Sequence, residues 1–274
     1  MQTFTFCSFK GGTSKTSTAI HIGAGCAGLH NKRVLLVDFD AQANLSIGLG
    51  LGPDHLTTMV PVLQGQQSIN EVIHQTSTPG LSIIPANAYL DGIERSPQLG
   101  NDPYAHERLR RALKSVEDQF DLCFIDTPPS LGWLTQSAFF ASNWSIVCAI
   151  PEAYSVIALR RLRDFHNSIR QYHPIDVFGV VLTFWDERGA VNSAFLEEIE
   201  GSFPQKVFAA KVRRDIAVSR AVLKGETVFE YDKTCRAADD YRALTAEFLA
   251  RFEGRSNSLE GQVERLLTAK DVGV

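Results

Sequence analysis

The sequence predicts an α/β protein with a single doubly wound, mostly parallel sheet that carries helices on both faces. Short apolar runs recur along the 274 residues, and segments of helix length, such as residues 105–116, 155–171 and 191–199, lie between them. Most runs are continuous rather than alternating, which is typical of strands covered on both faces. Strands are expected at residues 34–37, 81–84, 122–125, 146–150 and 177–182. Alternating strands and helices favour a parallel sheet.

Composition favours one domain, expected over residues 1–252, followed by a tail. The tail, residues 253–274, has a short helical pattern around Val263, Leu266 and Leu267. Residues 91–103 contain two prolines and two glycines, and an irregular surface excursion is expected there. No apolar run approaches the roughly 18 residues of a membrane span, and no signal core precedes the first strand. A cytoplasmic location is therefore expected. Five cysteines without a Cys-x-x-Cys pair argue against a metal cluster.

The most informative motif lies between the first predicted strand and the first predicted helix. It reads Phe9-Lys10-Gly11-Gly12-Thr13-Ser14-Lys15-Thr16-Ser17. A strand, a glycine-bearing loop and a helix in this order surround phosphates with backbone N–H groups, and the helix N-terminus adds partial positive charge. Residues 11–17 are therefore the candidate phosphate site. Lys15 would reach the β- and γ-phosphates, and the Thr16 hydroxyl would ligate Mg²⁺.

This loop resembles the deviant phosphate loop of ParA/MinD-type ATPases, Lys-Gly-Gly-x-Gly-Lys-Thr, with Ser14 in place of a glycine. The resemblance implies that Lys10 crosses a dimer interface and contacts the partner's phosphates. ATP would then be part of a sandwich dimer. Ser14 adds a Cβ where the backbone approaches phosphate and where a left-handed conformation is conceivable, so we expect impaired use of ATP.

Three aspartates follow predicted strands and extend the resemblance. Val37-Asp38-Phe39-Asp40-Ala41-Gln42 resembles the family's Asp-x-Asp-Pro-Gln, and Phe124-Ile125-Asp126-Thr127-Pro128-Pro129 resembles its second switch. The family pattern implies that Asp38 orients the water shell of Mg²⁺, that Asp126 holds Mg²⁺ through water, and that Asp40 positions the attacking water. Lys10, Lys15 and Asp40 are accordingly the candidate catalytic residues.

Later segments also match the family, so the resemblance covers roughly residues 1–250. Residues 183–188, Thr-Phe-Trp-Asp-Glu-Arg, look like its Thr-x-Tyr-Asp-x-Arg strand end. Val212-Arg213-Arg214-Asp215 aligns with Ile-Pro-Arg-Asn, which implies that Val212 and Arg213 contribute to the pocket for the base. The likeness is greatest to ParA proteins of the sort found on chlamydial plasmids.

A basic segment contrasts with the net charge of −4 for the whole chain. Residues 206–224 contain six basic residues and one acid, which gives a net charge of +5. A solvated face is one interpretation, and a salt-sensitive, sequence-independent DNA contact is the other. The resemblance to the ParA/MinD-type family favours the interpretation as a DNA contact. The candidate DNA-binding residues are Lys211, Arg213, Arg214, Arg220 and Lys224.

The resemblance implies a DNA partition ATPase with ATP and Mg²⁺ as cofactors. Its ATP-bound homodimer would bind non-specific DNA of the nucleoid, and a centromere-binding protein of the ParB type would stimulate slow hydrolysis and release it. Two alternatives stay open: a MinD-like membrane-associated ATPase, and a nucleotide-binding switch whose hydrolysis Ser14 impairs. Few apolar residues in the tail argue against membrane binding. The sequence identifies neither the partner nor the plasmid or chromosome that would be moved.

Overall fold

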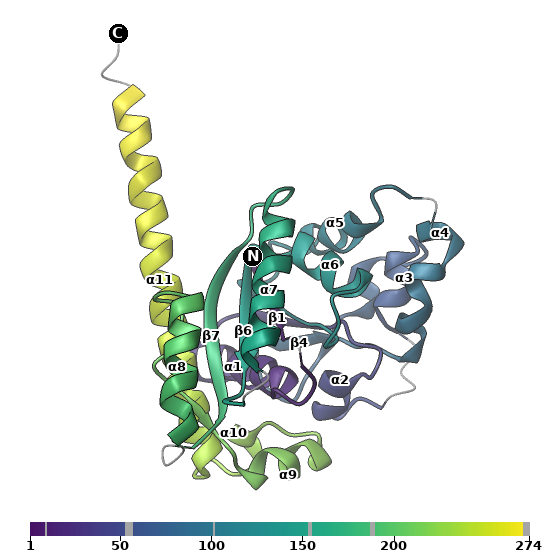
Figure 1. Cartoon of the computed structure of the whole chain (residues 1–274). Coiled ribbons are helices and arrows are strands. Elements are labelled where there is room, and N and C mark those ends of the chain that lie inside the picture. The colour runs from purple at the N-terminus through teal and green to yellow at the C-terminus, as the bar shows by residue number, and fades with distance from the viewer. Residues whose placement is uncertain (9, 53–56, 101, 153–154, 187–189, 271–274) are drawn as a thin grey trace.

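In the part of the chain that the structure describes, eight strands form one sheet, in the order β3-β4-β2-β5-β1-β6-β7-β8 (Figure 1). The computed structural model describes residues 1–8, 10–52, 57–100, 102–152, 155–186 and 190–270. All pairings between neighbouring strands are parallel except that of β3 with β4. The strands are β1 Gln2–Cys7, β2 Val34–Asp38, β3 His74–Gln75, β4 Leu81–Ile84, β5 Leu122–Asp126, β6 Trp144–Ala149, β7 Asp176–Trp185 and β8 Val212–Arg213. The predicted fold class is confirmed.

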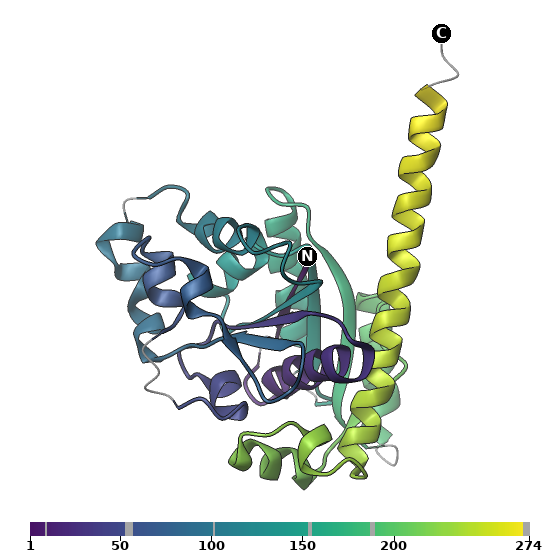
Figure 2. The same cartoon turned by 180° about the vertical axis from the view of Figure 1, so that it is seen from behind.

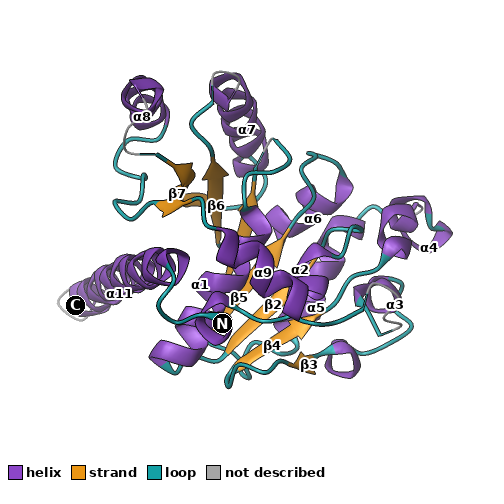
Figure 3. Cartoon of the chain, turned by 90° about the horizontal axis from the view of Figure 1, so that it is seen from below, coloured by secondary structure: helices purple, strands orange, loops and turns teal. Residues whose placement is uncertain are grey.

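Helices cover both faces of the sheet (Figure 3). The α-helices are α1 Lys15–His30, α2 Asn44–Gly48, α3 Met59–Leu63, α4 Pro97–Gly100, α5 Arg108–Lys114, α6 Trp133–Phe140, α7 Ser155–Arg170, α8 Ala190–Ser202, α9 Ile216–Lys224, α10 Val228–Tyr231 and α11 Arg236–Lys270. The 3₁₀ helices of the described residues are η1 Ile69–Val72, η2 Ala88–Arg95 and η3 Ala105–Glu107. The helices predicted at 105–116, 155–171 and 191–199 correspond to η3 with α5, to α7 and to α8.

Successive residues of each strand point to opposite faces, which divides the core into layers. Phe4 of β1 and Phe124 of β5 face α1 and α11, where they pack with Phe248. The alternate residues Cys123 and Ile125 of β5 face α5 and α6. In the view from behind, α1 lies beside α11 (Figure 2). Both faces of the sheet are therefore buried, as the continuous apolar runs predict.

Helices occupy much of residues 91–103 and also the C-terminal segment. The prediction of an irregular surface excursion at residues 91–103 is wrong, because η2 and α4 lie there and Leu90, Ile93 and Leu99 are buried. These residues join the core beside α5, which the local polar composition conceals. The α11 helix continues without a break through residues 252 and 253 and extends past the rest of the molecule (Figure 1). The division of the chain at that point stays a prediction.

The parallel order brings the sequence motifs to one edge of the sheet. Asp38 at the end of β2 is directly paired with Asp126 at the end of β5, and Phe6 of β1 is also opposite Asp126. The loop that contains Lys10 follows β1, and Glu152 follows β6. Ligands of such sheets bind beyond the carboxyl ends of the strands, so this edge is the candidate site. In the described residues, no helix is both long enough and apolar enough to cross a bilayer.

Candidate functional site

Gly12 and Ser14, in the described part of the loop between β1 and α1, have left-handed backbone conformations. Gly12 has φ 78°, and Ser14, the N-cap of α1, has φ 53° and ψ 25°. Glycine adopts this conformation freely, whereas a residue with a Cβ is less stable there by about 1–2 kcal/mol. The Ser14 side chain makes no capping hydrogen bond that would offset this cost. The left-handed conformation considered from the sequence is therefore present at the one position that departs from the family's loop.

Lys15, Thr16 and Asp126 form one hydrogen-bonded cluster. Lys15 is only 7% exposed, and its Nζ donates to Asp126 Oδ1 at 2.6 Å and to the carbonyl oxygen of Thr127. The Thr16 hydroxyl donates to Asp126 Oδ2, also at 2.6 Å. Desolvation would lower the pKa of Lys15, but the charge and hydrogen bond of Asp126 outweigh it, and the pKa is raised. Lys15 therefore stays charged where phosphates would enter.

Asp38 lies fully buried beside this cluster. Its Oδ2 accepts hydrogen bonds from the backbone N–H of Ser46 at 2.8 Å and from the Ser46 hydroxyl at 2.6 Å. Burial, and then the nearby Asp126 carboxylate, raise the pKa of Asp38 to about 7, although the bonds from Ser46 oppose the shift. We did not foresee Ser46 from the sequence. The sequence shows only a serine eight residues after Asp38, and the structure places this serine at a buried position of α2.

The residues present fit a magnesium ion that keeps some water. Two buried carboxylates, Asp38 and Asp126, repel each other, and the Thr16 hydroxyl lies against one of them. Oxygen donors of this kind suit Mg²⁺, which is usually held by one or two carboxylates together with phosphates and water. Within the described part of the chain, no cluster of three or more His, Cys, Asp or Glu could hold a metal by protein ligands alone. The remaining ligands would come from the nucleotide and from water.

Asp40 borders the cavity over the phosphate loop. This cavity has a volume of about 370 Å³ and is lined by residues 10–17 together with Asp40, Gln42 and Pro129. The Asp40 carboxylate accepts the backbone N–H of Gln42 at 3.0 Å, and burial raises the pKa of Asp40. A carboxylate fixed at the cavity border can position water there. Whether Asp40 does so stays a prediction.

Lys10 forms an ion pair with Glu152 within the same chain. The two side chains are 43% and 49% exposed, and Glu152 follows β6, 142 residues further along the sequence. The ammonium group of Lys10 is therefore held toward β6 and is open to solvent, in contrast to that of Lys15. Nothing in the sequence around Glu152 indicates this contact.

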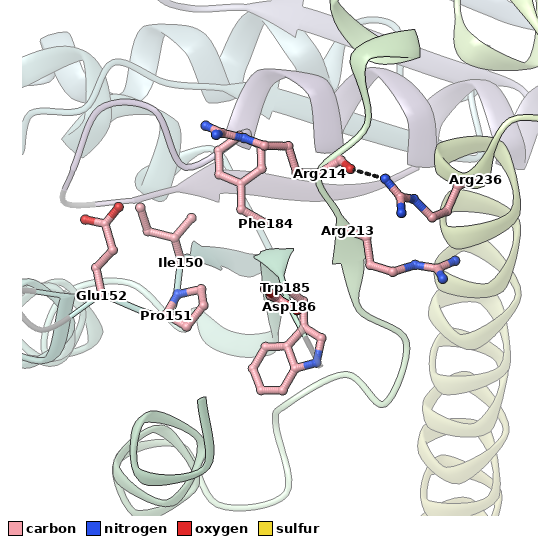
Figure 4. A pocket seen from close by; sticks show the side chains of 9 residues that line it. All are labelled: Ile150, Pro151, Glu152, Phe184, Trp185, Asp186, Arg213, Arg214 and Arg236. Atoms are coloured by element: carbon pink, nitrogen blue, oxygen red, sulfur yellow. Dashed lines mark hydrogen bonds between the residues drawn. The ribbon is translucent and has the colours of Figure 1, made fainter. Parts of the chain in front are cut away.

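Two further cavities are lined by residues of β7 and β8, and the smaller one also borders the phosphate loop. A cavity of about 370 Å³ is lined by Ser14 and Ser17 on one side and by Val212 and Arg213 on the other. Val212 and Arg213 therefore lie beside the phosphate loop, and their contribution to a pocket for the base stays a prediction. A larger cavity of about 790 Å³ is shown in Figure 4; its lining residues are Ile150, Pro151, Glu152, Phe184, Trp185, Asp186, Arg213, Arg214 and Arg236.

Phe184 borders both of these cavities. It has φ 50°, and the pairing of β7 with β8 shifts register around it. The Arg214 guanidinium lies 4.9 Å from the centre of its ring, an arrangement visible in Figure 4. Arg236 donates to the carbonyl oxygen of Arg214 at 2.6 Å. Phe184 belongs to the segment 183–188 that looks like a family motif, but residues 187 and 188 lie outside the described residues.

The five candidate DNA-binding residues lie in different environments. Arg213 is bound by Asp240 through contacts of 2.5–3.1 Å, and Lys211 Nζ lies 5.0 Å from the ring centre of Trp185. Arg214, Arg220 and Lys224 are exposed, the last two on α9. The sequence did not indicate Asp240 as a partner. Arg214, Arg220 and Lys224 are thus the exposed cations of residues 206–224, and their contact with DNA stays a prediction.

The fold and the site together define a phosphate-loop nucleotide-binding protein with a parallel α/β sheet. A family model described as an AAA domain matches residues 1–177. A ParA family protein of Chlamydia muridarum is 49% identical over 249 residues, which cover 91% of this chain and 98% of that protein. The chromosome partitioning protein ParA of Caulobacter vibrioides (strain NA1000 / CB15N) is 35% identical over 251 residues, 90% of this chain and 93% of that protein.

The chain therefore belongs to the ParA family. Among solved structures, cobyrinic acid a,c-diamide synthase from Mycobacterium smegmatis with bound ADP and magnesium is 26% identical, with a TM-score of 0.80. That match covers 92% of this chain and 95% of the synthase. The family assignment made from the loop and the aspartates is confirmed, together with the likeness to chlamydial ParA proteins. Nucleotide hydrolysis is the family's activity.

Proposed function

We propose that this chain is an ATP-dependent DNA partition ATPase. The observation that carries the proposal is the buried cluster of Lys15, Thr16 and Asp126 at the edge of the sheet, with Asp38 beside it. Membership of the ParA family and the name of the Caulobacter relative, a chromosome partitioning protein, support the cellular role. ATP and Mg²⁺ are the cofactors that this arrangement fits.

In this proposal each polar group has one task. Residues 11–17 hold the phosphates through backbone N–H groups, and Lys15 neutralises the β- and γ-phosphates. Thr16, Asp38 and Asp126 hold Mg²⁺, which screens the phosphate charge when it is bound. Asp40 positions the attacking water. The cavity beside Val212 and Arg213 receives the nucleoside.

The location of Lys10 supports the proposal of a dimer. Its ammonium group lies at the solvent-exposed border of the site, where it can leave Glu152 and reach the phosphates bound by a second copy. A cation supplied in trans stabilises the charge that develops during phosphoryl transfer. We therefore propose an ATP-bound homodimer, and we expect slow hydrolysis in a single chain.

DNA and a stimulating protein complete the proposed cycle. Arg214, Arg220 and Lys224 are exposed and would contact DNA phosphates without reading the sequence. A ParB-type centromere-binding protein would accelerate hydrolysis and release the dimer from DNA. The protein would accordingly be cytoplasmic and associated with the nucleoid.

A second candidate is a nucleotide-binding switch with impaired hydrolysis. The left-handed Ser14 favours it, because a Cβ in this conformation strains the loop that must enclose the phosphates. Phosphate release by the purified protein, alone and with non-specific DNA, distinguishes the two. Measurable turnover supports the ATPase, whereas tight ATP binding without turnover supports the switch.

The DNA part is tested by DNA retention with ATP, with ADP and without nucleotide, at several salt concentrations. We expect retention with ATP only, and a steep fall with salt. Arg220→Ala with Lys224→Ala should lower the slope of log affinity against log salt concentration by about two, because two phosphate contacts are lost. Arg110→Ala with Lys114→Ala is the matched control, because these exposed basic residues lie on α5, away from the nucleotide. Equal loss in both variants would contradict the assignment.

A further inference from the structure

A buried histidine joins the phosphate-loop helix to the C-terminal helices. His21 lies on α1, six residues after Lys15, and is 1% exposed. Its Nδ1 is 2.6 Å from the carbonyl oxygen of Ser17, and its Nε2 is 3.1 Å from the backbone nitrogen of Val228. A carbonyl only accepts and an amide N–H only donates, so Nδ1 carries the proton and Nε2 accepts. Burial lowers the pKa of His21 to about 4, so the ring is neutral at physiological pH.

One partner of His21 lines the proposed nucleotide cavity, and the other begins a helix that is connected to this cavity through α9. Ser17 is in the first turn of α1 and lines the cavity, while Val228 is the first residue of α10. The α10 helix follows α9 after three residues, and Ser219 of α9 lines the other side of the same cavity.

Tyr241 of α11 connects the ring to the cavity as well. The His21 ring stacks on the Tyr241 ring with centroids 4.5 Å apart and an interplanar angle of 18°. Tyr241 itself lines the cavity that Ser14, Ser17 and Val212 border. One neutral imidazole therefore contacts α1, α10 and α11 at once, directly behind the site proposed for the nucleoside.

We propose that His21 is a positioning residue that sets the spacing between the phosphate loop and the side of the cavity that receives the nucleoside. This inference rests on the proposed nucleotide site. The phosphates are held by the phosphate loop and Lys15, which lie at the start of α1. Their positions do not depend on the hydrogen bond between His21 and α10. The nucleoside must touch both sides of the cavity. Loss of the His21 contact should therefore weaken binding of ATP but leave binding of a bare phosphate chain unchanged.

The test compares ATP with inorganic tripolyphosphate, each with Mg²⁺, by calorimetry. His21→Leu removes both hydrogen bonds and replaces the imidazole ring with an apolar side chain of similar size. His21→Gln keeps an acceptor that can reach the Val228 N–H. Ile22→Val, at a fully buried neighbouring position of α1, is the control for destabilisation without loss of a hydrogen bond.

We expect His21→Leu to weaken ATP binding about fivefold to tenfold, as loss of the one buried hydrogen bond that joins α1 to Val228 of α10 predicts. His21→Gln should restore most of the ATP affinity. Tripolyphosphate affinity should stay within about twofold of wild type in all variants, which is the usual effect of a neutral surface substitution. A parallel fall for ATP and tripolyphosphate, or equal ATP binding by His21→Leu and Ile22→Val, would overturn the proposal.

Hydrogen exchange of the Val228 amide supplies a readout without nucleotide. Exchange should be faster in His21→Leu than in wild type, and close to wild type in His21→Gln. Unchanged exchange in His21→Leu would show that the link is absent and would overturn the proposal whatever the affinities. Failure of the wild-type protein to bind either ligand would instead refute the proposed nucleotide site, and the inference with it, so the two failures are distinguishable.

Discussion

The charged groups at the inner end of the site differ from those at its border. Lys15, the first residue of α1, and Asp126, the last residue of β5, are 7% and 0% exposed, whereas Lys10 and Glu152 are 43% and 49% exposed. Breaking a buried ion pair costs about 3–5 kcal/mol, while an exposed pair contributes about 0–1 kcal/mol. The inner groups are thus set before a ligand arrives. The outer pair can exchange partners, which is what a dimer interface requires.

The largest effect is expected when the inner pair is broken. Lys15→Ala removes the cation beside the β- and γ-phosphates and leaves Asp126 buried without it, so ATP affinity should fall at least about 100-fold. Isothermal titration with ATP and Mg²⁺ measures this. Thermal unfolding must be followed in parallel, because the unpaired Asp126 also destabilises the fold. Near-normal ATP affinity in a folded Lys15→Ala protein would refute the phosphate site.

A second large effect concerns turnover rather than binding. Asp40 is at the cavity border and contacts neither Lys15 nor Thr16 by a hydrogen bond that the structure shows, so Asp40→Ala should bind ATP within about threefold of wild type. Hydrolysis should fall at least about 100-fold, since a positioned group contributes at least that much. The ATP-bound dimer should then persist in sedimentation. Lys10→Ala is the comparison: there the dimer itself should weaken, and identical sedimentation of both variants would contradict these separate roles.

The inner part of the site could be predicted from the sequence because its residues are adjacent to strand ends. The β2 and β5 strands are continuous apolar runs that end in Asp38 and Asp126, and parallel order places these two aspartates beside each other. The family's glycine before Lys15 also pointed to the left-handed conformation of Ser14.

The ion pairs at the solvent-exposed border of the site could not be predicted from the sequence, because they join residues far apart in the chain. Lys10 and Glu152 are separated by 142 positions, and no local pattern links them. The Arg213–Asp240 contact spans 27 positions and depends on how α11 packs beside β8. The buried residues of η2 and α4 were missed for another reason: short helices have too few turns to show a period.

An intermediate effect is expected at Ser14, which belongs to the inner region but is strained. Ser14→Gly should raise stability by about 1 kcal/mol and increase ATP binding, dimer fraction and turnover, because glycine adopts φ 53° without a Cβ clash. Ala43→Gly is a matched control, since Ala43 is the N-cap of α2 with φ 53° and ψ 29°. It relieves the same backbone strain but also removes a buried methyl group, so its gain in stability should be smaller, and ATP use should not change. Equal nucleotide affinity, dimer fraction and turnover in Ser14→Gly and wild type would establish that the loop tolerates serine without cost.

The smallest effect is expected at the border, and it tests whether Lys10 can exchange partners. Glu152→Gln removes the charge that holds Lys10, so the ATP-dependent dimer fraction should rise, by less than about fivefold because an exposed pair is worth at most about 1 kcal/mol. Stability should change by less than about 0.5 kcal/mol. The rise should shrink in 0.5 M salt, where charges about 4 Å or more apart are largely screened. Glu198→Gln is the control, because Glu198 pairs with Arg160 at similar exposure on α8 and α7. If both variants change the dimer fraction equally, general surface charge accounts for the result. If Glu152→Gln lowers it, Glu152 takes part in the interface instead of holding Lys10 away from it.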